Sequence, residues 1–168
     1  MVRAGIALGS NLGDRLANLR AARVCLEAIS SDPKSLRSAP VYQTEPVLCP
    51  AGSPEFFNTV IEIEVHATPL ELLSLTQEIE RKLGRPTKAP RNAPRIIDVD
   101  LLYMGSLVFN SPTLTLPHPR LAERRFVLAP LADINPDLML PGQSETVASL
   151  KAGLKSTETE PIVLLRHW

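Results

Sequence analysis

The sequence of 168 residues has few aromatic side chains, few cysteines and no excess of charge of either sign. Its 18 basic and 18 acidic residues balance, which excludes the broad cationic field of a general nucleic-acid or membrane-surface binder. No apolar run approaches the roughly 18 residues of a membrane-spanning helix. The two cysteines, Cys25 and Cys49, lack the spacing of a metal or redox pair, so reduced thiols are expected.

The first residues also lack a basic segment followed by an apolar one, the pattern of an export signal. We therefore expect a cytoplasmic protein. With 44% hydrophobic residues, a chain of this length can bury a core without disulfides, and residues 1–168 are expected to form a single domain. Proline, by contrast, is abundant, because the chain contains 16.

Apolar residues that alternate predict strands, and those at helical spacing predict helices. The main predicted elements are a strand from Val2 to Leu8, a helix from the N-cap Asp14 to Ile29, strands over 36–44 and 56–65, a helix from Thr68 to Gly84 and a strand over 96–104. Pro40 marks the strand over 36–44 as an edge strand or a bulged one. This order is the ferredoxin-like pattern, an α+β sandwich with a mainly antiparallel sheet and helices packed on it. Beyond Gly105 the weaker predictions are short strands over 107–110 and 162–165 and helices over 121–130 and 145–154.

Asp98 and Asp100 alternate within an apolar strand, so both carboxylates are expected on one face of the sheet. The neighbouring apolar residues are expected on the other face: Ile97, Val99, Leu101 and Tyr103. Two like charges on one face repel unless a cation neutralises them, and Mg²⁺ prefers carboxylate oxygens. The alternative is a pair of aspartates that are solvated at a strand end or paired with nearby arginines.

The proline-rich segment before this strand carries four cations: Arg85, Lys88, Arg91 and Arg95. Guanidinium groups match phosphate oxygens, and carboxylates for a metal beside cations for phosphate are the equipment of phosphoryl transfer. A solvated basic stretch and an RNA contact are the alternatives. Because four unpaired cations repel one another, we expect this loop to close as a lid only over a negatively charged ligand.

Other polar residues are less specific. Gln77 and Glu80 share one face of a helix, as residues bordering an apolar stripe commonly do. His118 lies between two prolines, and a lone loop histidine is more often structural than catalytic. The turn over 9–14 is not a Walker A loop, because no Gly-Lys-Ser/Thr follows it.

Several segments in constant order over residues 7–136 resemble the 6-hydroxymethyl-7,8-dihydropterin pyrophosphokinase family of folate biosynthesis. They are ALGSNLGDR at 7–15, YQTEP at 42–46, FFNTVIEIE at 56–64, QEIERKLGR at 77–85, RNAPRIIDVDLL at 91–102, LPHPR at 116–120 and RRFVLAPL at 124–131. The resemblance implies a ferredoxin-like fold and transfer of pyrophosphate from ATP to the hydroxymethyl oxygen of the pterin, with release of AMP. Attack on the β-phosphorus is implied by the resemblance alone.

The resemblance also implies roles by position. Asp98 and Asp100 are implied as ligands of two Mg²⁺ ions, and with Arg85 and Arg95 as the catalytic residues. The implied ATP site contains Gln77, Glu80, Arg85, Arg91, Arg95, Leu101, His118 and Arg124. The implied pterin pocket contains Thr44, Glu45, Pro46, Phe56, Asn58, Asp98 and Phe126. Asn92 and Thr87 depart from the family pattern, which often has an aromatic residue and sometimes another arginine there, and this bears on how the loop closes.

Two other functions share the fold. An RNA-recognition module needs aromatic residues on its central strands, whereas the strand over 96–104 carries two aspartates. A ligand-sensing domain would bind a small molecule without turnover. The partners we expect are ATP and the pterin, without nucleic acid or membrane. The sequence does not fix the oligomeric state, for which a monomer is the working expectation.

Overall fold

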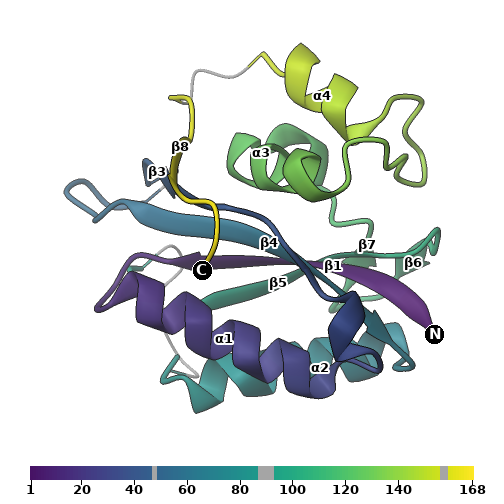
Figure 1. Cartoon of the computed structure of the whole chain (residues 1–168), viewed down its shortest axis with the longest axis horizontal. Coiled ribbons are helices and arrows are strands. Elements are labelled where there is room, and N and C mark those ends of the chain that lie inside the picture. The colour runs from purple at the N-terminus through teal and green to yellow at the C-terminus, as the bar shows by residue number, and fades with distance from the viewer. Residues whose placement is uncertain (47–48, 87–92, 156–158) are drawn as a thin grey trace.

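The computed structural model describes residues 1–46, 49–86, 93–155 and 159–168 (Figure 1). The strands are β1 (Val2–Ser10), β2 (Arg37–Ser38), β3 (Val41–Thr44), β4 (Phe56–Val65), β5 (Asp98–Met104), β6 (Phe109–Asn110), β7 (Thr115–Leu116) and β8 (Ile162–Leu165). The α-helices are α1 (Arg15–Ile29), α2 (Pro69–Lys82), α3 (Arg125–Ile134) and α4 (Val147–Gly153), and 3₁₀ turns cover Pro33–Ser35 and Leu121–Glu123.

The central sheet has the order β5-β1-β4-β3-β8, with β2 beside β4, and its neighbouring strands pair antiparallel. The short β6 and β7 form a separate pair. Helices α1 and α2 cover one face of the sheet, and α3 and α4 lie on the other (Figure 1). The predicted ferredoxin-like α+β sandwich is therefore confirmed, with a further helical layer.

Local sequence signals fix where the first two helices begin. The Asp14 carboxylate accepts a hydrogen bond from the Ala17 amide at 3.0 Å, as an N-cap does. Thr68 and Glu71 form a capping box at the start of α2, with Pro69 in the first turn. The Asp14 cap agrees with the sequence prediction, and α2 begins directly after Thr68, where the predicted helix starts.

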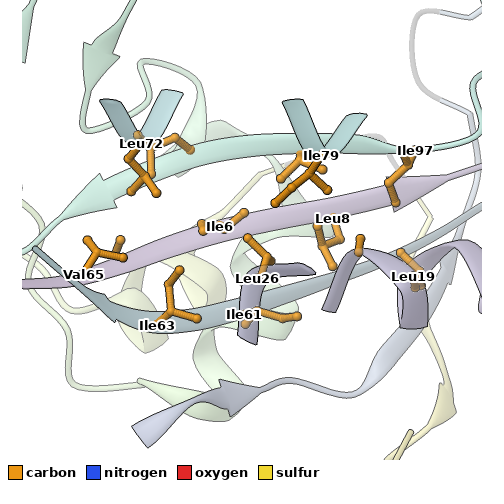
Figure 2. Close-up of a cluster of buried hydrophobic side chains, with 14 of the residues drawn as sticks. Ile6, Leu8, Leu19, Leu26, Ile61, Ile63, Val65, Leu72, Ile79 and Ile97 are labelled. Carbon is orange, nitrogen blue, oxygen red and sulfur yellow. The ribbon is translucent and has the colours of Figure 1, made fainter. Parts of the chain in front are cut away.

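The larger apolar core lies between the sheet and helices α1 and α2 (Figure 2). Its members include Ile6, Leu8, Ile61 and Ile63 from the strands, Leu19 and Leu26 from α1, and Leu72 and Ile79 from α2. A second core lies between the opposite face and α3 and α4, and it includes Val60, Leu102, Tyr103, Leu128 and Leu131. The sheet is therefore buried on both faces.

The predicted strand over 36–44 is interrupted at Pro40, which separates β2 from β3. Both pieces pair with β4, so the prediction of a bulged strand is correct. Pro40 has no amide to donate to a ladder. The neighbouring residue Ala39 keeps its hydrogen bond to the sheet, because its backbone N–H donates to the Val60 carbonyl at 2.9 Å.

The predicted face of Tyr103 is wrong. A register shift opposite Gly5 and Ile6 pairs Ile6 with Leu101 and Gly5 with Tyr103, so Leu102 is an extra residue in β5. Leu101 therefore packs in the larger core, whereas Tyr103 packs in the second one. The ring of Tyr103 lies against Gly5, where a Cβ would come within 2.1 Å of it.

The remaining C-terminal elements agree with the sequence in kind. The helix predicted over 121–130 is a 3₁₀ turn followed by α3, which extends to Ile134 with Pro130 inside it. Helix α4 and strand β8 form where they were predicted, and β8 adds an edge strand beside β3. None of the helices in the described ranges combines the length and apolar character that crossing a bilayer requires.

Candidate active site

A pocket of about 140 Å³ opens on the α3 side of the sheet, where β1 and β3 end and β4 and β5 begin. It contains nine of the residues predicted for the site: Thr44, Glu45, Phe56, Asn58, Arg95, Asp98, Asp100, Arg124 and Phe126. These residues come from three strands, the segments after β3 and before β5, and the start of α3. The sheet therefore joins the two halves of the predicted site.

One end of the pocket is aromatic and amide-bearing. Phe56 from β4 and Phe126 from α3 both line it. Asn58 is buried, and its Nδ2 donates to the Thr44 hydroxyl at 2.6 Å, which fixes how the amide is turned. Gly9 pairs with Asn58 across the sheet, and a Cβ there would lie 2.7 Å from the Asn58 Oδ1. A glycine at position 9 thus keeps this end of the pocket clear.

The other end is built around Asp98. Its two carboxylate oxygens accept from Arg85 Nη1 and Arg95 Nη1, each at 2.8 Å. Arg85 also pairs with Glu80 on α2, whose Oε1 accepts from the Val99 amide at 2.8 Å. These contacts correct one expectation: Arg85 and Arg95 are not unpaired in the free chain, because carboxylates on the sheet and α2 already bind them.

Burial has the largest effect on the pKa values of Asp98 and Glu80. It raises the pKa of Asp98, and the charge of Asp100 raises this pKa further, whereas Arg95 and Arg85 lower it. Burial also raises the pKa of Glu80, against the bond from the Val99 amide and the charge of Arg85. The site therefore favours a ligand cation near Asp98, since that would stabilise the charged carboxylate.

Asp100 is the more accessible of the two aspartates. Its side chain is 49% exposed, and Arg124 Nη1 lies 4.0 Å from its Oδ2. The Arg124 guanidinium also lies 5.5 Å from the centre of the Phe126 ring. Burial lowers the pKa of Arg124, and the charge of Asp100 raises it. Arg124 thus links the acidic and aromatic ends of the pocket.

Asp98 and Asp100 fit Mg²⁺ by their chemistry, because both offer carboxylate oxygens on one face of β5. Within the described ranges, no group of three or more histidine, cysteine, aspartate or glutamate side chains could hold a metal ion. Two carboxylates supply only part of an octahedral shell. Phosphate oxygens and water are the usual ligands that complete it.

Three other predicted residues, within the part of the chain that the structure describes, do not line the pocket. Gln77 is exposed on α2, Pro46 is half-buried after β3, and the Leu101 side chain is buried in the larger core, on the opposite face from the aspartates. Arg91 lies outside the described residues, as do Asn92 and Thr87.

His118 lies beside β5, and Arg120, two residues further along the chain, lines the pocket. The His118 amide donates to the Leu102 carbonyl at 2.7 Å, and its Nδ1 accepts from the Arg120 amide at 3.2 Å. Burial, Arg124 and Arg120 lower the pKa of His118, which favours the neutral ring. Arg120 lines the pocket and was missed by the sequence analysis. The available signal was a cation two residues after His118 in the LPHPR segment.

Known proteins match both the sequence and the fold. The sequence pattern of the family described as 7,8-dihydro-6-hydroxymethylpterin-pyrophosphokinase matches residues 5–136, which include every lining residue named above. The chain belongs to this family.

Its relatives include single-function and longer proteins. The chain is 44% identical over 129 residues to the 2-amino-4-hydroxy-6-hydroxymethyldihydropteridine pyrophosphokinase of Bacillus subtilis, which covers 77% of this chain and 75% of the relative. It is 35% identical over 160 residues to the folic acid synthesis protein fol1 of Pneumocystis carinii, with 94% of this chain covered. The chain spans only 21% of that longer protein.

Solved structures give the same fold. The HPPK-DHPS of Plasmodium falciparum, solved with pteroate, superposes with a TM-score of 0.66 at 14% identity and covers 90% of this chain but 42% of its own. At this identity the likeness concerns the fold alone. It agrees with the ferredoxin-like sheet order described above.

Proposed function

We propose that the chain transfers pyrophosphate from ATP to 6-hydroxymethyl-7,8-dihydropterin, which yields the pterin diphosphate and AMP for folate biosynthesis. The observation that carries this proposal is the meeting, in one pocket, of the Asp98 and Asp100 carboxylates with the aromatic and amide end at Phe126 and Asn58. Family membership supports the same reaction. We further propose that the chain acts as a monomer, because its own residues line this pocket.

The pterin side is proposed to use stacking and amide recognition. The rings of Phe56 and Phe126 offer flat apolar surface for a heterocycle. Asn58 carries donors and an acceptor, which match the amide-like edge of a pterin, and its bond to Thr44 holds it in one orientation. A ligand without that edge would leave the buried amide of Asn58 unpaired, so the pocket selects for it.

The phosphate side is proposed to use the arginines. Arg85 and Arg95 bind Asp98 in the free chain, and they exchange this carboxylate for phosphate oxygens when the nucleotide enters. Arg124 and Arg120 add positive charge to the same pocket. These groups orient the triphosphate in line with the pterin hydroxyl and stabilise charge on the transferred group.

Asp98 and Asp100 would hold two Mg²⁺ ions, which neutralise the phosphates and favour loss of the hydroxyl proton. The pterin oxygen forms a bond to the β-phosphorus, and the bond from that phosphorus to the oxygen of the α-phosphate breaks. AMP leaves with that oxygen, and the hydroxyl proton passes to solvent. The residues contribute position and charge, which account for most of catalysis in phosphoryl transfer.

An AMP-release assay with the reduced pterin, ATP and Mg²⁺ tests the proposal. We expect AMP and the pterin diphosphate in equal amounts, and neither product without pterin or with excess chelator. Binding of both ligands without AMP would instead indicate a sensing domain. A chain that folds, binds no pterin and retains single-stranded RNA would favour the RNA-binding alternative, against which the two aspartates of β5 argue.

A further inference from the structure

Asn11 is a buried polar residue directly after β1, and its side chain is not part of the pocket described above. It is 1% exposed. Its side-chain Oδ1 accepts from the backbone N–H of Arg95 at 2.8 Å, and its backbone N–H donates to the Arg95 carbonyl at 3.2 Å. Its side-chain Nδ2 donates to the Pro54 carbonyl at 3.3 Å. One residue therefore ties two distant segments to the end of β1.

Each of these segments leads to one half of the site. The Arg95 backbone is bound by Asn11 at both its N–H and its C=O, and the Arg95 side chain binds Asp98. Pro54 stands two residues before Phe56, which lines the aromatic end. Asn11 is thus connected to the acidic end through Arg95 and to the aromatic end through Pro54.

The segment that carries Asn11 has its own support. The Asn18 amide on α1 donates to the Ser10 hydroxyl at 3.1 Å and to the Leu12 carbonyl at 2.9 Å, and Asp14 caps the same helix. These bonds fix the backbone on both sides of Asn11. The side-chain amide of Asn11 is planar and its backbone is held in place. It can therefore keep its hydrogen bonds to both Arg95 and Pro54 only while these two segments keep their relative position.

We infer that Asn11 is a positioning residue that couples the phosphate side of the site to the pterin side. This inference rests on the proposed function. It predicts that Asn11 orients Arg95 for the phosphates and transmits the position of one segment to the other through its amide. Asn11 itself contacts neither substrate in this scheme, so its effect passes through Arg95 and Pro54.

The first test compares three variants in steady-state kinetics. We expect Asn11→Ala to lower kcat/KM by about 10- to 100-fold, because misplaced positioning groups cost that much in enzymes. Asn11→Asp keeps the acceptor for the Arg95 amide but loses the donor to Pro54, so it should retain more activity than Asn11→Ala. The matched control is Asn18→Ala, which removes an amide that bonds to Ser10 and Leu12 but not to Arg95 or Pro54, so it should lose much less activity than Asn11→Ala.

A double-mutant cycle tests whether the effect passes through Arg95. In the Arg95→Ala background, Asn11→Ala should cost less than about threefold, since the guanidinium that it positions is gone. Full additivity of the two losses would overturn the inference. Thermal unfolding of each variant checks that the fold is retained. If Asn11→Ala does not fold, Asn11→Asp carries the same cycle.

Two readouts need no turnover and so separate this inference from the proposed reaction. Hydrogen exchange at the Arg95 amide should accelerate much more in Asn11→Ala, which loses the acceptor of that amide, than in Asn18→Ala, which keeps it. In titrations, an ATP analogue that cannot transfer pyrophosphate should raise pterin affinity in the wild-type chain, and Asn11→Ala should reduce this gain at least about fivefold. Unchanged exchange or an unchanged gain would overturn the positioning role, whereas absent AMP release by the wild type would overturn only the reaction.

Discussion

Asp98 is the residue at which the free and ligand-bound states must differ. In the free chain Arg85 and Arg95 occupy its two oxygens. The proposed reaction needs the same arginines on phosphate and the same carboxylate on a metal ion. A cation alone must displace two arginines, whereas a nucleotide that arrives with it gives them new partners. Metal and nucleotide should therefore bind with positive coupling.

The first prediction concerns this exchange. Arg85→Ala leaves one oxygen of Asp98 without its cation, so the affinity for Mn²⁺ without nucleotide should rise about fivefold, which equals about 1 kcal/mol. The affinity for ATP should fall, because a phosphate ligand is lost. Calorimetric titration measures both. Lys82→Ala is the control, because it removes a neighbouring cation of α2 that has no pair with Asp98. Equal metal affinity in wild type and Arg85→Ala would show that the arginine does not compete with the metal.

The two aspartates are also expected to differ in their effect on stability. Asp98→Asn and Asp100→Asn should each nearly abolish AMP release. Asp100 is half-exposed, so its replacement should leave the unfolding temperature unchanged. Asp98→Asn removes the shared partner of Arg85 and Arg95 and should cost about 1–2 kcal/mol while the fold survives. Near-normal turnover in either variant would remove it from the proposed metal site.

For single residues, the sequence predicted the members of the site best where a residue type was unusual for its strand or helix. Two aspartates in an apolar strand are unusual, and both lie in the pocket. Leu101 is typical of any strand, and its side chain lies in the core. Arg120 was missed because a cation in a loop is ordinary until the fold places it in the same pocket as the aspartates.

Among the elements, α3 depends most on a contact that the sequence did not reveal. Glu62 of β4 is fully buried, and its Oε1 accepts from the Tyr103 hydroxyl and from Asn135 Nδ2, the latter at 2.7 Å. Asn135 ends α3, and Arg3 and Arg37 lie within 3.7 Å of the other oxygen. The alternation of side chains along β4 puts Glu62 on the same face of the sheet as Asn58. Tyr103 reaches that face only because the bulge in β5 adds one residue.

Glu62→Gln should therefore loosen α3 from the sheet. The variant keeps the shape but loses the charge that pairs with two arginines, so the free energy of unfolding should fall by about 2 kcal/mol. Urea unfolding measures it. Glu64→Gln is the control, because Glu64 lies two residues on in β4 and pairs with the partly exposed Arg3 at 2.7 Å, a pair that should contribute less than about 1 kcal/mol. If both variants lost a similar free energy of unfolding, Glu62 would contribute no more to holding α3 on the sheet than a surface ion pair does.

The start of α3 carries the ring proposed to stack on the pterin. Phe126→Ala should weaken pterin binding by about 1–3 kcal/mol and leave ATP binding nearly unchanged, since stacking serves only the flat ligand. Equilibrium titration with each ligand gives the comparison. Because Phe126 also packs against the second core, equal weakening of both ligands would mean that its loss disturbs the whole pocket and that the stacking role is wrong.

On the scale of the whole molecule, the sequence predicted the sheet and its first helical layer. Hydrophobic periodicity was strong there, because α1 and α2 each present one apolar stripe to the sheet. The second layer was harder to predict. Strand β4 is buried on both faces, so its sequence does not show which face is exposed to solvent. Helix α3 contains a proline in its interior, which weakens the helix prediction there. The place of β8 beside β3 depends on a long-range pairing without a local signal.

The last prediction follows the segment between α2 and β5 in the whole chain. Trypsin cleaves after lysine and arginine unless proline follows. Pro86 blocks cleavage after Arg85. The Arg95 backbone is bound by Asn11 at both N–H and C=O, so we expect slow cleavage there as well. The sequence then leaves Lys88 and Arg91, which lie outside the described residues, as the expected sites in the free chain.

Ligands should change this pattern if the segment closes over the phosphates as an active-site lid. A non-transferable ATP analogue with Mg²⁺ and pterin should protect Lys88 and Arg91, as followed by mass spectrometry of the fragments. Asp98→Asn should lose that protection, because its site lacks a carboxylate for the metal. Cleavage at the same rate with and without both ligands would show that the segment does not close. The arginine exchange at Asp98 would then occur without a lid, since Arg85 and Arg95 stand on the fixed flanks of the segment.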